Sequence, residues 1–252
     1  MKKYSKPNKV DIFYKKTKVV TFDKKFLDSS KWPKHWKKIY TKLYPRLTKV
    51  KLSKNISTIE RSFSEILFSR KSERNFNAKK ELSKKTLSCL LFHSAGIKPE
   101  NIKPAWDETR RFYPSAGARY PLETYLVVNK VNSLPKGLYH YSVPDHSLDV
   151  LWLNNNLSKQ LASICGQKWV VKAQIIFIIT AAIERTMTKY KDRGGRYILI
   201  ETGHLAQNIY LVATALNLKV CAIGGFKDDK INSILDLDEE AEKSLYIICV
   251  GS

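Results

Sequence analysis

Short apolar runs in the second half of the chain predict the strands of a sheet. The segment TYLVV is rich in β-branched residues, which favour an extended backbone. Two further runs flank Pro144-Asp145-His146, a turn signal, so we expect them to pair as a hairpin. The run AQIIFIITAAI is apolar without alternation, which is typical of a central strand covered on both faces. The predicted strands span residues 124–128, 137–143, 148–153, 173–183 and 244–250.

Helical spacing of apolar residues predicts helices before and between these strands. Ser57 and Glu60 have the spacing of a capping box, and an apolar stripe follows them to about Arg70. Ser83 is placed to begin a second helix and Gly96 to end it. The longest predicted helix is apolar almost all round, so we expect it to be covered on every side. It spans 196–218, after Gly194-Gly195, and shorter helices are predicted at 157–165, at 184–192 and from about 228 to 235.

Composition narrows the class of protein. The chain has 252 residues, of which 43% are hydrophobic, which is enough for a sizeable core and excludes disorder throughout. The sequence has no apolar run of about 18 residues, so we expect no transmembrane helix. The basic N-terminus is not followed by an apolar segment, so we expect no Sec-type signal peptide. We therefore expect a cytoplasmic protein. The four cysteines lie far apart and are expected to be small buried hydrophobes rather than disulfides or metal ligands: Cys89, Cys165, Cys221 and Cys249.

Positive charge is concentrated at the N-terminus. Residues 1–55 carry 18 lysines and arginines against 3 acids, a net charge of +15 out of +22 for the chain. Such an arm can bind nucleic acid or an anionic membrane. Lysine outnumbers arginine, however, and no nucleic-acid-binding module is recognisable, so we interpret the charge as a solvated surface and expect no nucleic-acid partner. We predict a basic extension at 1–55 that packs against a main domain at 56–252 through its aromatic residues Trp32, Trp36, Tyr40 and Tyr44.

Three segments contain residue types that suit a ligand with a phosphate and a flat ring. Residues 70–74 (RKSER) combine three cations with a hydroxyl, and the planar fork of arginine suits a phosphate monoester. Residues 114–121 (PSAGARYP) place small residues between two prolines, where the backbone can approach a flat ligand and Arg119 would add charge. Gly224-Gly225 repeats this small-residue pattern. The alternative is a solvated helix end for the first segment and ordinary tight turns for the other two.

Polar residues on the predicted helices are further candidates. Glu201, His204 and Asn208 fall at i, i+3 and i+7 of the long helix, so we expect them to share one face, either in a site or in a structural network. Lys189-Tyr190 joins two ionisable groups, and the ammonium can lower the pKa of the phenol and make it a usable base. Spacing alone predicts that Lys189 and Tyr190 are surface residues. No HExxH, Walker A, GxGxxG or GxSxG motif is present, and no metal site is expected.

Taken in chain order, these segments resemble the nitroreductase family, and within it the SagB-type dehydrogenases. RKSERNF is similar to the first flavin-phosphate motif of the family, and PSAGARYPLETYLVV is similar to a signature of the subfamily with its following strand. KYKDRGGRYILIETGHLAQNIYL resembles the central segment of the subfamily, and Gly224-Gly225-Phe226 resembles the glycine loop near the flavin ring. The resemblance extends over about residues 10–251, including the lead-in at 32–47 and the hairpin that begins at Gly137.

The resemblance implies an α+β fold that binds FMN, with a mixed, mainly antiparallel sheet flanked by helices. It also implies an intertwined homodimer with two flavin sites at the subunit interface. Lys189 and Tyr190 match the pair that azoline-oxidising members use in catalysis. The cofactor-binding residues that it implies are Arg70, Lys71, Ser72 and Arg74 for the phosphate and the ribityl or ring edge, Ser115, Ala116, Gly117, Ala118 and Arg119 along the isoalloxazine, and Gly224 and Gly225 near N5.

The sequence departs from the family pattern in two places. Many members continue past the last strand with a basic residue on the flavin phosphate, whereas this sequence ends at Gly251-Ser252, so we expect that contact to be missing or to come from elsewhere. The N-terminal segment is also richer in lysine than the pattern requires.

The function implied is that of an FMN-dependent oxidoreductase that dehydrogenates thiazoline or oxazoline rings on a peptide. Lys189 as an ammonium would stabilise a Tyr190 phenolate, which would remove the carbon-bound proton, with oxygen as the final electron acceptor. The implied partners are a second copy of the chain, a peptide substrate and its modification enzymes. Two alternatives stay open: an NAD(P)H-dependent nitro or quinone reductase on the same fold, and a non-catalytic binding or assembly protein that uses the basic segment.

Overall fold

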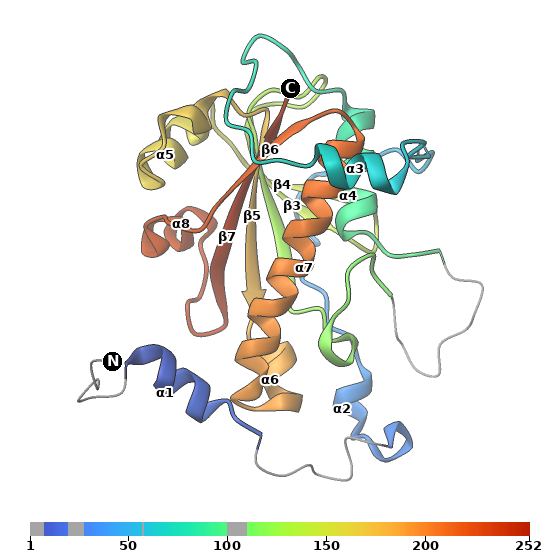
Figure 1. Cartoon of the computed structure of the whole chain (residues 1–252), viewed down its shortest axis with the longest axis vertical. Helices are drawn as coiled ribbons and strands as arrows, with labels where there is room; N and C mark the ends of the chain where they lie inside the picture. Colours follow the sequence, from blue (N-terminus) through green and yellow to red (C-terminus); the bar gives the residue numbers. More distant parts are fainter. Residues whose placement is uncertain (1–7, 20–27, 57, 100–109) are drawn as a thin grey trace.

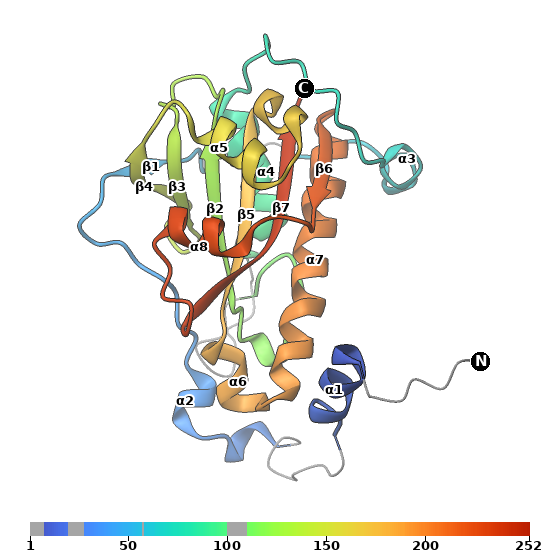
Figure 2. The same cartoon turned by 90° about the vertical axis from the view of Figure 1, so that its left-hand side faces the viewer.

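A single sheet organises the molecule. The computed structural model describes residues 8–19, 28–56, 58–99 and 110–252, and within them seven strands form one sheet in the order β1-β4-β3-β2-β5-β7-β6, with every neighbouring pair for which a register is defined antiparallel (Figures 1 and 2). All five predicted strands are confirmed; β1 and β6 are short and were not expected. The bounds are β1 Lys49–Lys51, β2 Leu122–Val128, β3 Gly137–Ser142, β4 Ser147–Leu153, β5 Ile175–Ala182, β6 Lys219–Ile223 and β7 Glu242–Gly251.

Helices cover both faces of the sheet, which confirms the predicted α+β class. Helices α4 (Lys84–Ala95) and α7 (Arg193–Ala215) lie on one face, and α5 (Leu157–Ile164) and α8 (Asp228–Leu235) lie on the other (Figure 2). Strand β5 is apolar on both faces because each face meets one of these layers. The remaining helices and 3₁₀ turns are α1 Lys9–Lys16, η2 Ser29–Lys31, α2 Lys34–Lys37, α3 Phe63–Ser69, η3 Ala116–Ala118, η4 Lys168–Lys172 and α6 Glu184–Tyr190.

The helix predicted to follow a Ser57–Glu60 capping box begins later than expected. The box is formed instead by Ser62 and Glu65: the Ser62 Oγ accepts from the Glu65 N–H at 3.3 Å, and the Ser62 N–H donates to the Glu65 carboxylate at 3.1 Å. Two serines precede the same apolar stripe, and the second one caps it. Ser57 itself lies outside the described residues. Helix α4, in contrast, begins after Ser83 and ends before Gly96 as predicted.

Helix α7 differs from its prediction in two ways. It begins at Arg193, so Gly194-Gly195 lies inside it rather than before it. A Cβ at position 194 would come within 3.1 Å of the Met187 Cα, so this glycine permits the close approach of α6 and α7. The helix is also not covered on every side, because Leu199 and Ile200 are each 53% exposed.

The N-terminal residues that are described lie against the main body. Trp36 is buried and the Tyr44 hydroxyl lies 3.2 Å from that of Tyr125, as the sequence predicted for these aromatic residues, whereas Tyr40 is 46% exposed. Strand β1, within the predicted extension, adds to the sheet edge beside β4. The division of the chain at residue 55 stays a prediction.

Candidate functional site

The small-residue loop at 115–120 has a tightly fixed, left-handed backbone. Gly117, Ala118 and Tyr120 have φ values of 59°, 51° and 44°, which only glycine adopts at low cost. The Ser115 Oγ accepts from the Tyr120 N–H at 2.8 Å and donates to Glu201 of α7 at 2.6 Å. The loop is therefore held by its own turn and by a buried carboxyl group.

Arg119 ties the same loop to two other elements. Its Nε donates to the Arg185 carbonyl of α6 at 2.8 Å, and its Nη1 donates to the Trp36 carbonyl at 2.6 Å. The side chain is 3% exposed. Three parts of the chain that are distant in sequence thus meet at this loop.

The structure brings the predicted catalytic pair to the predicted cofactor loop. Lys189 and Tyr190 end α6, and a Cβ at Gly117 would lie 2.8 Å from the Lys189 Nζ and closer still to the Tyr190 Oη. Such distances are shorter than real Cβ contacts, so a side chain at position 117 would displace the ends of Lys189 and Tyr190, and the left-handed backbone favours glycine here as well. Lys189 is 1% exposed, so its interpretation as a surface residue is wrong.

The charge state expected for this pair needs a correction. Burial, together with the positive charge of Arg119, lowers the pKa of Lys189 to about 8. Burial raises the pKa of Tyr190 to about 12, with a further contribution from Tyr197, and the opposing effect of Arg119 is smaller. The phenol is therefore not activated as the sequence analysis expected, because burial penalises the phenolate. The Lys189 amine is the group of the pair that titrates near neutral pH.

Glu201 is a second buried titratable group beside the loop. It is 2% exposed, and its Oε1 has no hydrogen-bond partner among the described residues. Burial raises its pKa to about 8, against the hydrogen bond from Ser115 and the charge of Arg111. Glu201, His204 and Asn208 do not share a site or a network, because His204 is exposed and Asn208 donates to the Ser94 carbonyl at 3.4 Å.

A cavity of about 420 Å³ opens beside the loop. Its wall includes the small residues Ser115, Gly117 and Ala118, and the Nε of the buried Arg111 has no hydrogen-bond partner among the described residues. These features fit a flavin ring, which is flat and has polar edges. The small residues leave the backbone open to the ring, aromatic side chains line the cavity, and the buried Arg111 Nε, which has no partner within the described residues, is a donor for a polar edge. The other lining residues are Trp32, Lys98, Arg110, Phe112, Tyr113, Pro114 and Tyr120.

The predicted phosphate-binding segment 70–74 runs beside the edge strand β6, where the Glu73 N–H donates to the Val220 carbonyl at 2.8 Å. The Ser72 Oγ lies 3.0 Å from the Tyr210 Oη, and the Arg70 guanidinium lies 5.8 Å from the centre of the Tyr210 ring. Arg74 instead lies over the ring of Trp169, and Lys71 faces solvent beside Glu73, 3.5 Å from its carboxylate.

Helix α7 connects this edge to the cavity. Its Tyr210 meets Ser72 and its Glu201 meets Ser115, and these two residues are nine positions apart, which is about 14 Å along the helix axis. The loop Gly224-Gly225 follows β6, and a Cβ at Gly225 would meet nothing within 4 Å, so its backbone is open to a ligand.

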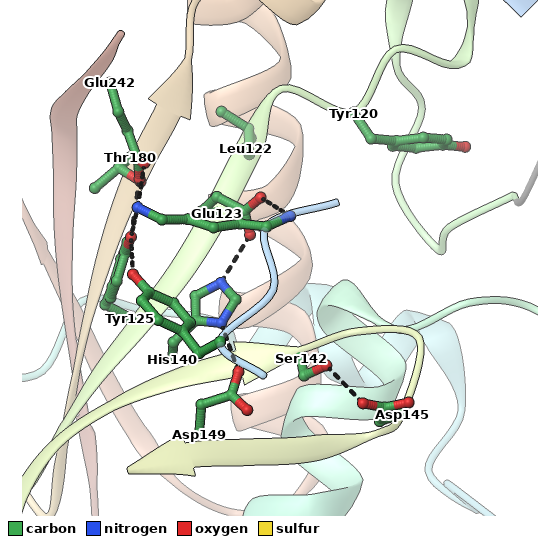
Figure 3. A network of polar contacts seen from close by, with 12 residues as sticks. Tyr120, Leu122, Glu123, Tyr125, His140, Ser142, Asp145, Asp149, Thr180 and Glu242 are labelled. Carbon is green, nitrogen blue, oxygen red and sulfur yellow. Dashed lines mark hydrogen bonds and ion pairs between the residues drawn. The ribbon is translucent and has the colours of Figure 1, made fainter. Parts of the chain in front are cut away.

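The sequence did not predict a row of buried charged residues that crosses the adjacent strands β2, β3 and β4. In Figure 3, the Glu123 carboxylate accepts from the His140 Nε2 at 2.9 Å, and the imidazole Nδ1 lies 3.1 Å from the Asp149 carboxylate. Glu123 also pairs with Arg185 of α6 at 2.5 Å. Burial alone would raise the pKa of Glu123, but the hydrogen bond from His140 and the charge of Arg185 lower it to about 2. The ionised carboxylate therefore links the sheet to the helix that carries Lys189.

A signal for this row does exist in the sequence. His140 and Asp149 lie on the two arms of the predicted hairpin, and the register of β3 and β4 places them opposite each other. Glu123 and Arg185 carry no comparable signal, because their contact depends on the path of the chain between β5 and α6.

Comparisons with known proteins agree with this fold. The profile described as "Nitroreductase family" matches residues 67–252. MJ1384 of Methanocaldococcus jannaschii, a protein named as a nitroreductase, is 37% identical over 71% of this chain and 87% of its own length. The Microcin B17-processing protein McbC of Escherichia coli is 29% identical over 70% of this chain and 65% of its own, so the chain spans slightly less than two thirds of that relative.

A solved structure extends the likeness to nearly the whole chain. It is the E. coli microcin synthetase McbBCD complex with truncated pro-MccB17 bound, of which one chain superposes with a TM-score of 0.63. The match covers 96% of this chain and 91% of that chain at 23% identity, which shows a shared fold. Within the described residues, no helix combines the length and apolar character needed to cross a bilayer, and no cluster of metal-binding side chains is found.

Proposed function

The chain belongs to the nitroreductase family, and from this premise we propose that it is an FMN-dependent oxidoreductase that dehydrogenates thiazoline or oxazoline rings on a peptide. The observation that carries the proposal is the buried Lys189 amine beside Gly117 of the predicted cofactor loop, where a Cβ would lie only 2.8 Å from the Lys189 Nζ. A reductase that only passes electrons between NAD(P)H and a second substrate needs no buried base of this kind. The microcin-processing relative, whose name refers to a peptide product, supports the same class of substrate.

The flavin would be held by the residues that the family pattern assigns. Ser115, Ala116, Gly117 and Ala118 would lie along the ring, and Arg119 fixes their loop through α6 and the Trp36 carbonyl. Arg70, Lys71, Ser72 and Arg74 would bind the phosphate, with Gly224 and Gly225 presenting backbone amides. When FMN is bound, it supplies the two-electron acceptor that no side chain can provide.

The protein supplies the proton chemistry. Oxidation of an azoline to an azole removes one proton and one hydride equivalent, so a base must take the carbon-bound proton, and bound FMN would supply the acceptor for the hydride equivalent. The neutral form of Lys189 is that base, because its pKa of about 8 leaves a useful fraction unprotonated near neutral pH. Tyr190, with its raised pKa, stays protonated and can donate a hydrogen bond to the ring. Oxygen is the proposed final electron acceptor.

Substitution of the pair tests this proposal. Lys189→Met and Tyr190→Phe keep the volume of each side chain, and each should retain FMN while losing on the order of 100-fold or more in azoline oxidation, the usual contribution of a general base or acid. Lys159→Met, at an exposed position of α5, is the matched control and should oxidise at the normal rate. Normal oxidation by both site variants would refute the assigned roles.

The second candidate is an NAD(P)H-dependent nitro or quinone reductase. The similarity to MJ1384, which is named as a nitroreductase, favours it. High turnover of nitroaromatics or quinones with NAD(P)H, without azoline oxidation, would select this alternative.

A further inference from the structure

The N-terminal segment is docked onto the main body by buried polar contacts. We use the name strap for residues 28–46, which precede the range matched by the family profile. The Lys42 Nζ donates to the Glu242 carboxylate and to the Tyr125 hydroxyl, both at 2.7 Å, and the Lys42 N–H donates to Glu123 at 3.2 Å. These contacts place the strap over the row of buried charges in Figure 3. One of the lysines of the basic extension is therefore an anchor rather than a free surface charge.

The other end of the strap reaches the candidate site. The Trp36 carbonyl accepts from Arg119 of the cofactor loop, and the Trp36 and Trp32 rings lie edge to face with their centres 6.5 Å apart. The centre of the Trp32 ring lies 3.1 Å from the Lys189 Nζ. Trp32 also lines the 420 Å³ cavity. The strap thus supplies an aromatic wall that touches both the cavity and the proposed base.

The surroundings of the Lys189 amine contain few polar groups. Its Nζ has no hydrogen-bond partner among the described residues. Arg119 is the charged group that acts on it from the loop, and the Tyr190 ring lies 5.2 Å away on the same helix. From the described part of the strap, the faces of the Trp32 and Trp36 rings approach it, with their centres 3.1 Å and 5.7 Å from the Nζ. Water would otherwise solvate an amine at this position.

We propose that Trp32 is a positioning residue of the reaction, which the docked strap places over Lys189 to keep water from the amine and to form the substrate-facing wall of the cavity. The inference rests on the proposed role of Lys189 as the base. It assigns the strap to the active site, whereas the sequence predicts only that the aromatic residues of this basic segment pack against the main domain. The flat azoline ring is the substrate group that would pack on the indole face.

Removal of the indole should change the proton affinity of Lys189. Burial is the largest influence on the pKa of this amine and lowers it. Admission of water should therefore raise the pKa from about 8 toward the ordinary value of about 10.4, in spite of the lost cation–π contact. A ring of similar shape should preserve the low value.

The test is a pH series of pulse acetylation with acetic anhydride on FMN-loaded protein, with the extent at Lys189 read by mass spectrometry. The midpoint should rise by at least about one pH unit in Trp32→Ala and stay near the normal value in Trp32→Phe. Tyr40→Ala, an exposed aromatic residue of the same strap, is the matched control and should leave the midpoint unchanged. Trp32 is only half-buried, so its loss should not unfold the protein.

Two further outcomes separate the parts of the inference. Lys42→Met should raise the midpoint as Trp32→Ala does, because it undocks the strap, and an unchanged midpoint would overturn the anchoring role. The pH at which azoline oxidation reaches half its maximum should move upward with the midpoint in Trp32→Ala. An unchanged midpoint in Trp32→Ala would overturn the inference even if the normal protein oxidises azolines. A raised midpoint in a protein that never oxidises them would refute the proposed function alone.

Discussion

At the scale of single residues, burial decides which group can do the chemistry. The sequence places Lys189 beside Tyr190, and adjacency alone suggests an ammonium that activates a phenol. In the structure both side chains are withdrawn from water, so each is pushed toward its neutral form. Burial lowers the pKa of the amine to about 8, within reach of neutral pH, and raises the pKa of the phenol further away from it, to about 12. The sequence predicts that Lys189 and Tyr190 lie in the site. It does not predict which of the two we propose as the base, because that depends on what covers the pair.

Glu201 gives a prediction at the same scale. Its folded pKa of about 8 lies above the ordinary value of about 4.3, so the folded state binds more protons than the unfolded state between these values. Its contribution therefore lowers the free energy of unfolding as pH rises through this window, by up to about 1.4 kcal/mol per pH unit, and is constant above it. Glu201→Gln should remove that slope.

Denaturant unfolding at a series of pH values measures this effect. Glu240→Gln, at an exposed position, should unfold with the same pH dependence as the unaltered protein. Equal slopes for Glu201→Gln and the unaltered protein would show that the carboxyl group is already ionised in the folded state.

At the scale of elements, the spacing of apolar residues predicts those strands and helices whose apolar pattern is strong. The apolar runs of β2 and β5 and the hairpin around Pro144-Asp145-His146 required no tertiary information. The start of α3 was misplaced because two serines compete for one cap. The sequence places Gly194-Gly195 before the long helix, but both glycines lie inside it, and the close contact of α6 with α7 favours a glycine at position 194. Short β6 was missed because five residues carry too weak a pattern.

The loop at 115–120 carries the sharpest prediction about an element. Gly117→Ala adds a Cβ that meets Lys189 and Tyr190 at a left-handed backbone position, so it should cost about 1–3 kcal/mol of stability and displace the pair. Azoline oxidation should fall with it. Gly203→Ala is the matched control, because that glycine lies in α7 with nothing within 4 Å of an added Cβ.

Thermal and denaturant unfolding of the two variants compare these effects. The control should gain about 0.5–1 kcal/mol, since alanine favours a helix interior. A Gly117→Ala variant with normal stability and normal activity would contradict the close approach of the loop to α6.

At the scale of the whole molecule, the exposed apolar residues support the proposed homodimer. Leu199 and Ile200 interrupt the solvent-facing side of α7, and Phe63 and Phe68 of α3 are 66% and 92% exposed. Exposed apolar side chains can contribute to a subunit interface, and we propose Leu199 and Ile200 as the pair to test. The non-catalytic alternative, in contrast, depends on the basic extension, and Lys42 of that extension is committed to an ion pair.

The dimer can be tested by introducing negative charge at Leu199 and Ile200. The double variant Leu199→Glu and Ile200→Glu should run as a monomer in light scattering, because burial of two unpaired carboxylates would cost more than the interface can offset. Val171→Glu, a half-exposed apolar position on η4, should leave the dimer intact. A dimer that survives the double variant would place the interface elsewhere.

The sharpest test of the central claim is anaerobic mixing of the FMN-loaded protein with an azoline-bearing peptide, followed by the visible absorbance of the flavin. The account predicts that the peptide bleaches the flavin in a single turnover, that the peptide loses two hydrogens by mass, and that admitted oxygen restores the colour. Bleaching by NAD(P)H but not by the azoline peptide would contradict it.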